Sequence, residues 1–254
     1  MDLKELGLLH LRQLGINNYE NWYDEFPIYI DNFPDLMYWN ILPTKDLGIV
    51  EVPLKNVIGT DHISYGKGYT WLENLGNLKK FKKWYTKKSF LDYFNSNINQ
   101  GLGIYLYKFG NKYIIGGGNN RIHIAKFLNI PYLNLPVHEH FFDEEFFNLI
   151  NRYIELGIPL NIPEKNLTRV YTWIINFKDI LTIGLHGFDT LKKFLEIYES
   201  ISLDWSTSFK TKIFLLFNSD SNKFKHIYVN NDFDLQTISL IRILKFNIFN
   251  NAKL

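Results

Sequence analysis

The stretch IYLYKFGNKYIIGGGNNRIHIAKFLNIPYLNLPV, residues 104–137, constrains the fold more than any other part of the chain. Two runs rich in β-branched and aromatic residues flank Gly110-Asn111, a dipeptide that favours a tight turn. This pattern predicts a β-hairpin over residues 104–117, with its second strand ending at Ile115. Three consecutive glycines follow, and they permit backbone conformations that other residues avoid.

A short helix is expected directly after the glycines, from about Asn120 to Leu128. Asn129 can close this helix in a left-handed conformation, and Pro131 prevents its continuation. Residues 132–138 then return as a strand. The local order of hairpin, helix and strand predicts an α/β arrangement.

The start of this helix has the chemistry of an anion site. A helix N-terminus has unpaired N–H groups and a partial positive charge that can hold a phosphate, and Arg121 adds a permanently charged, planar donor. Asn119 or Asn120 is expected to cap the helix, and His123 and Lys126 are expected to point outward together. The alternative is a glycine turn that only joins strand to helix, with Arg121 exposed or paired with a carboxylate.

The rest of the chain is expected to surround this segment. Residues 2–14 have helical periodicity, and Gly15 ends that helix. The C-terminal part contains two hairpin-plus-helix patterns, which suggests a small duplicated α+β domain. The expected segments are an irregular arm at 16–47, a strand at 49–58, a long loop at 59–77, helices at 78–98, a helix at 143–157, hairpins at 169–185 and 210–229, a helix from Asp189 or Thr190, and a helix at 235–246 capped by Asp232 or Asp234.

The amino-acid composition excludes several kinds of chemistry but says less about the fold. The net charge is only +2, with 28 basic and 26 acidic residues, which argues against a dominant nucleic-acid-binding surface. Cysteine is absent, so disulfides, thiolate zinc sites and thiol catalysis are excluded. The first residues lack the apolar stretch of a signal peptide, and no apolar run is long enough to span a bilayer. The expected compartment is the cytoplasm.

Three motifs occur in order across the middle of the chain: VEVPLKNVI at 50–58, GNNR at 118–121 followed by IAK at 124–126, and LNIP at 128–131 leading to LPV at 135–137. The ParB/sulfiredoxin-like superfamily typically has an opening strand, a Gly-x-x-Arg helix start, a helix with small residues and an Ile-Pro-Val segment after it. Residues 49–140 therefore resemble this superfamily. The resemblance implies an α/β (α+β) fold with a ParB/sulfiredoxin-like core. We expect three parts: an N-terminal helix and arm at 1–48, this domain at 49–140, and a C-terminal α+β domain of two hairpin-helix units at 141–254.

Members of this superfamily bind nucleoside triphosphates at the helix start. The resemblance therefore implies ATP or CTP, with Mg²⁺, and phosphates held at the helix start, Gly116–Arg121. The nucleotide-binding residues that it implies are Gly117, Gly118, Asn119, Asn120 and Arg121, with Lys67 and His123 as further contacts.

Several departures weaken the match. Sulfiredoxin's reactive cysteine would fall at about Asn119, so its repair chemistry cannot occur here, and Asn120 replaces a second basic residue of the family. ParB's arginine-bearing segment after the first strand is also missing, because the corresponding loop here is GTDHISYGKGYTW. Lys67, His62 or Lys79 could supply the charge lost there. No helix-turn-helix pattern follows the domain, which weakens a role in DNA partition.

Three ionisable residues near the predicted first strand, Glu51, Asp61 and His62, are candidates for catalysis. A carboxylate beside the phosphates could hold Mg²⁺ or act as a base in phosphoryl transfer. Glu51 would have to face the pocket, which strand alternation does not decide. The alternative for all three is ordinary turn chemistry.

Two further clusters have a functional and an ordinary interpretation. His138, Glu139 and His140 combine two imidazoles with a carboxylate, a set that can bind a divalent metal, but we favour a polar strand exit and expect no metal there. From Lys79 to Lys88, six lysines and three aromatic residues could contact a nucleic-acid backbone. The more usual role of such a run is the solvated face of an amphipathic helix.

The sequence therefore supports a nucleoside-triphosphate-binding protein of ParB/sulfiredoxin type, with NTPase or phosphotransferase activity left open. The alternative is a DNA-associated ParB-like protein or nuclease of phage or mobile-element origin, without NTP turnover. We expect no membrane association, and a protein partner or a second copy bound through the C-terminal domain.

Overall fold

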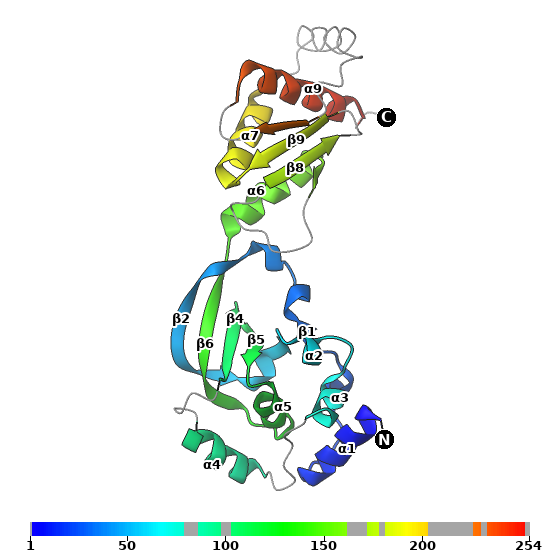
Figure 1. Cartoon of the computed structure of the whole chain (residues 1–254), viewed down its shortest axis with the longest axis vertical. Helices are drawn as coiled ribbons and strands as arrows, with labels where there is room; N and C mark the ends of the chain where they lie inside the picture. Colours follow the sequence, from blue (N-terminus) through cyan, green and yellow to red (C-terminus); the bar gives the residue numbers. More distant parts are fainter. Residues whose placement is uncertain are drawn as a thin grey trace. The chain divides into compact units, whose positions relative to one another are not determined.

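In a computed structural model, the chain divides into two compact units, Met1–Phe142 and Asp143–Leu254. The structure describes residues 2–78, 86–97, 103–161, 172–177, 181–202, 226–229 and 233–251. Each unit is a mixed α/β structure built around one sheet (Figure 1). The residues expected to form a separate arm, 1–48, belong to the same unit as the segment that follows them.

The first unit contains a six-stranded mixed sheet in the order β1-β3-β5-β4-β6-β2. The pairs β1–β3, β3–β5 and β4–β6 are parallel, whereas β4–β5 and β2–β6 are antiparallel. The strands are β1 (Ile28–Tyr29), β2 (Trp39–Pro53), β3 (Val57–Thr60), β4 (Tyr105–Phe109), β5 (Lys112–Gly117) and β6 (Tyr132–Phe142). The predicted hairpin is confirmed as β4 and β5, joined at Gly110 with φ +60°.

Helices of the first unit contribute apolar side chains to one hydrophobic core that also includes residues of this sheet, and α1 packs on α3. Asp2 caps the first of them through a reciprocal pair of hydrogen bonds with Glu5, a capping box. The helices are α1 (Leu3–Gln13), α2 (Ile63–Gly66), α3 (Trp71–Gly76), α4 (Lys87–Asn97) and α5 (Asn119–Phe127), with 3₁₀ turns η1 (Asn21–Asp24), η2 (Ile30–Asn32), η3 (Leu36–Tyr38) and η4 (Leu54–Asn56). The predictions of α1 and α5 are confirmed, and Asn129 closes α5 with φ +51°.

The central strand β5 has buried side chains on both faces of the sheet. Tyr113 and Ile115 belong to the main core together with the helices, whereas Ile114 packs on the opposite face with Phe33 and Phe109. Burial on both faces explains why this strand is a continuous apolar run rather than an alternating one.

Two expectations for the first unit are wrong. The region at 16–47 is not irregular throughout, because β2 begins at Trp39 and pairs with β6 along most of its length. The region at 59–77 is not one long loop, because it begins with the end of strand β3 and contains α2 and α3. Thr70 caps α3 in a second capping box with Glu73.

The second unit contains a four-stranded sheet in the order β10-β9-β8-β7. Its strands are β7 (Leu160–Asn161), β8 (Thr172–Phe177), β9 (Leu181–His186) and β10 (His226–Val229), and its helices are α6 (Glu144–Glu155), α7 (Phe188–Ser200) and α9 (Leu235–Asn251). The first hairpin-helix pattern is confirmed as β8, β9 and α7. Of the second, the expected hairpin at 210–229 lies outside the described residues except for β10, which pairs parallel to β9.

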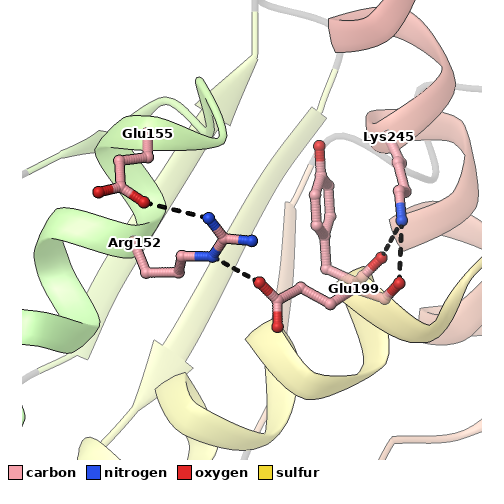
Figure 2. Close-up of polar contacts among 5 residues, drawn as sticks. Arg152, Glu155, Glu199 and Lys245 are labelled. Atoms are coloured by element: carbon pink, nitrogen blue, oxygen red, sulfur yellow. Dashed lines mark hydrogen bonds and ion pairs between the residues drawn. The ribbon is translucent and has the colours of Figure 1, made fainter.

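Polar contacts tie helices α6, α7 and α9 of the second unit together (Figure 2). Arg152 of α6 donates from Nε to Glu199 of α7 at 2.6 Å and from Nη1 to Glu155 at 3.1 Å. Lys245 of α9 donates to the carbonyl oxygens of Tyr198 at 2.6 Å, Glu199 at 3.2 Å and Ile201 at 2.7 Å. The ammonium therefore satisfies carbonyls that the end of α7 leaves without helical partners.

Candidate functional site

A pocket of about 400 Å³ opens at the amino end of α5. This volume lies within the range typical of small-molecule sites. The end of β5, the start of α5, the α2 region and α4 all contribute to its wall. The lining residues are His62, Tyr65, Tyr93, Gly116, Gly117, Gly118, Asn119, Asn120, Arg121 and Ile124.

The three glycines are required by packing inside the protein. A Cβ at Gly116 would lie 2.1 Å from Cε2 of Tyr105, closer than side-chain atoms approach each other. Gly118 has φ +82°, and a Cβ there would lie 2.7 Å from Cγ1 of Ile104. The glycine run therefore has a structural cause in the β4–β5 hairpin, so it does not by itself indicate a ligand.

Gly118, rather than Asn119 or Asn120, is the N-cap of α5, and it makes no side-chain capping bond. The carbonyl of Gly118 accepts from the backbone N–H groups of Arg121 at 2.9 Å and Ile122 at 3.1 Å. The N–H groups of Asn119 and Asn120 precede the first helical bond and have no acceptor among the described residues. Two donors and the positive end of the helix dipole are thus available at the pocket.

The two asparagines have different surroundings. The Asn120 side chain accepts through Oδ1 from the hydroxyl of Tyr65 at 2.6 Å. Burial raises the pKa of the Tyr65 phenol, which therefore stays protonated and donates. Asn119 is 7% exposed, and its Oδ1 has no hydrogen-bond partner among the described residues. A buried amide oxygen without a partner is costly, and a ligand donor would relieve that cost.

The end of β3 places one of the three catalytic candidates at the pocket. His62 is exposed, lines the pocket and has Nδ1 2.8 Å from Ser64 Oγ. Asp61 is adjacent in sequence but is not a lining residue, and its backbone N–H donates to the carbonyl of Ile115 at 3.0 Å. Burial raises the pKa of the Asp61 carboxyl group.

The structure places two further expected site residues, Glu51 and Lys67, outside the pocket lining. Glu51 is exposed on β2, which is separated from β5 by β4 and β6, and it does not line the pocket. Lys67 lies with its Nζ 4.6 Å from the ring centre of Tyr29 and does not line the pocket. Neither supplies the missing basic residue or the carboxylate.

His123 does not point outward. It is fully buried, its Nδ1 lies 2.8 Å from the carbonyl oxygen of Asn119, and its ring is 4.8 Å from that of Trp71. Burial lowers the pKa of His123 to about 4, so its imidazole is neutral near pH 7. It packs beneath the first turn of α5 instead of contacting a ligand.

The His138-Glu139-His140 segment lies within β6, which continues to Phe142. Glu139 forms an ion pair with Lys108, and the His140 ring stacks on Phe109 with their centres 4.5 Å apart. In the part of the chain that the structure describes, no group of three or more His, Cys, Asp or Glu side chains could hold a metal ion.

The lysine run falls largely outside the described residues, which omit 79–85. Lys87 and Lys88 begin α4. The proposed nucleic-acid contact from Lys79 to Lys88 therefore stays a prediction.

Sequence reasoning missed two aromatic residues of the pocket wall. Tyr65 lies within the segment 59–77, for which the sequence predicts a loop, and Tyr93 is one aromatic residue among several in α4. The capping box TWLE at residues 70–73 was a signal that could have revealed a helix in that loop.

Comparison of the chain with models of protein families, with curated proteins and with solved structures gives no match. No helix among the described residues is both long enough and apolar enough to cross a membrane.

Proposed function

We propose that this protein binds a nucleoside triphosphate, ATP or CTP, with its phosphates at the amino end of α5. One observation carries the proposal: Asn119 and Asn120, whose N–H groups have no acceptor among the described residues, line the same pocket as Arg121. Backbone donors at a helix start, together with a guanidinium group, form an arrangement suited to phosphate oxygens.

The resemblance of GNNR at 118–121 to the Gly-x-x-Arg helix start of the ParB/sulfiredoxin-like superfamily supports the same location. Asn120 stands where that superfamily often has a second basic residue, and here it accepts from Tyr65. Tyr65 and Tyr93 line the pocket beside the glycines and offer ring surface to a nucleobase.

The lining residues do not fit a metal site made by the protein, because none of them is a carboxylate. Mg²⁺ prefers oxygen ligands and is commonly held by one or two carboxylates together with substrate phosphates. We therefore propose nucleotide binding rather than a reaction, and of the three catalytic candidates only His62 is at the pocket.

The proposal is tested by thermal melting with ATP, CTP, GTP and UTP, each with Mg²⁺. A ligand at a hundredfold its Kd adds about 2.7 kcal/mol to the free energy of unfolding. Arg121→Gln should abolish the shift, whereas Arg12→Gln, which changes an exposed arginine on α1, should retain it.

Two results contradict the proposal: no nucleotide shifts the melting of the wild-type protein, or Arg121→Gln retains the full shift. Chromatography of the nucleotide after incubation with the protein would then show whether a bound nucleotide is hydrolysed or transferred.

A further inference from the structure

A second and larger pocket, of about 730 Å³, lies at the carboxyl end of α5 and shares no lining residue with the first. Its wall is mainly apolar and aromatic. The contributing side chains include Trp22, Phe26, Leu54, Trp71 and Tyr132. Phe26 is 63% exposed and Tyr132 is 49% exposed, so two large aromatic side chains of the wall are only partly covered by the protein itself.

One cationic group is enclosed in this wall. Lys126, in the last turn of α5, has its Nζ 4.1 Å from the ring centre of Trp71 and 5.2 Å from that of Trp22. The ammonium also donates to the carbonyl oxygen of Val57. Indole faces and a carbonyl oxygen stabilise a cation and fix its position, but they carry no negative charge.

The Lys126 ammonium has no carboxylate within ion-pair distance among the described residues. Desolvation lowers its pKa to about 8, and the charge of Glu25 only partly opposes this effect. At pH 7 the amine is therefore mostly protonated in surroundings that disfavour charge. A buried charge without a counter-ion is costly, and an anionic group that entered the pocket would offset that cost.

The two carboxylates of the wall restrict which anion can enter. Glu20 already accepts from Trp22 Nε1 at 2.8 Å and from Asn129 Nδ2 at 3.2 Å. Glu25 lines the same pocket and adds negative charge near Lys126. Both would repel a phosphate or another multiply charged group, so the pocket favours an anion with one negative charge.

We propose that this pocket binds a small organic monocarboxylate, with its apolar or aromatic body against Trp22, Phe26 and Tyr132 and its carboxylate accepting from Lys126. A carboxylate is the singly charged anion that pairs most directly with an ammonium group. The aromatic wall then covers the rest of the ligand and buries the exposed ring surface.

The proposal is tested by calorimetric titration of the full chain with phenylacetate, indole-3-acetate and octanoate. Phenylacetamide is the matched neutral ligand, since it has nearly the shape of phenylacetate without its charge. We expect at least one carboxylate to bind saturably, and phenylacetamide to bind at least about tenfold more weakly than phenylacetate, as expected for the loss of a charged hydrogen bond.

Lys126→Met should weaken carboxylate binding by a similar factor, because methionine keeps most of the side-chain volume without the charge. Lys55→Met is the matched control, since Lys55 is an exposed residue of the same pocket and is not proposed to contact the carboxylate. It should change the affinity by less than about twofold.

The pH dependence of the wild-type protein provides a measurement that needs no variant. Carboxylate affinity should fall as the pH rises above about 8, because the neutral amine of Lys126 cannot pair with the anion. Three results would overturn the proposal: no saturable binding at millimolar ligand, equal binding of phenylacetamide, or unchanged affinity at high pH. Because the pockets share no residue, a failure here leaves the nucleotide proposal intact.

Discussion

Replacing Gly118 with alanine separates backbone strain from packing at the start of α5. The residue has φ +82°, and the left-handed region costs an L-residue about 1–2 kcal/mol. The new Cβ would also lie 2.7 Å from Cγ1 of Ile104, which is 5% exposed and cannot turn away freely. Overpacking of this kind costs about 1–3 kcal/mol, so Gly118→Ala should destabilise the protein by about 2–5 kcal/mol.

Gly68 is a matched control in the same unit. Its φ of +84° is nearly the same, but a Cβ there would meet nothing within 4 Å. Gly68→Ala should therefore cost only the backbone part, about 1–2 kcal/mol. Urea denaturation, followed by tryptophan fluorescence and circular dichroism, gives the free energy of unfolding of both variants. If Gly118→Ala lowers the free energy of unfolding by no more than Gly68→Ala does, the close approach of Ile104 is not the reason that position 118 requires glycine.

Two further predictions concern single side chains. His123 protonates near pH 4 in the folded protein but near pH 6.5 when unfolded, so the free energy of unfolding should fall as the pH falls between these values, by on the order of 3 kcal/mol. Urea titrations at pH 7 and pH 4 should show a smaller fall for His123→Gln, and an equal fall would contradict the burial of a neutral imidazole. Lys245→Met removes three hydrogen bonds to carbonyls at the end of α7 and should cost about 1–3 kcal/mol. Lys192→Met, which removes only an exposed ion pair with Glu145, should cost at most about 1 kcal/mol in the same assay.

Local patterns predicted the elements whose signals lie within a short stretch of sequence. Neighbouring residues predict the turn at Gly110 and the left-handed residue Asn129. They also predict the β8–β9 hairpin, in which Phe177 pairs with Leu181. The candidate site at Arg121 could be located for the same reason, because a strand, a glycine run and a helix start are consecutive. These features depend on backbone chemistry, which is nearly independent of the rest of the fold.

Pairing between distant segments could not be predicted in the same way. Strand β2 was hidden because its register shifts between Asp46 and Ile49, which interrupts the alternation of apolar residues. The position of Glu51 depended on the order of strands in the sheet. A single strand contains no information about which partner lies beside it, so the sequence could not decide whether Glu51 reaches the pocket.

The wrong predictions for two polar residues of α5, His123 and Lys126, have one physical cause. Polar side chains three residues apart in a helix usually face water. The sequence therefore predicts that His123 and Lys126 of this nine-residue helix point to solvent. Here α5 has the sheet on one side and α3 with η4 on the other, so little of its surface faces water. His123 and Lys126 both contact Trp71 of α3, the first as a neutral ring and the second as a cation over the indole face. When a helix is covered on two sides, its polar residues can therefore lie in enclosed surroundings instead of in water. In α5, His123 and Lys126 lie in such surroundings beside the two pockets at the ends of the helix.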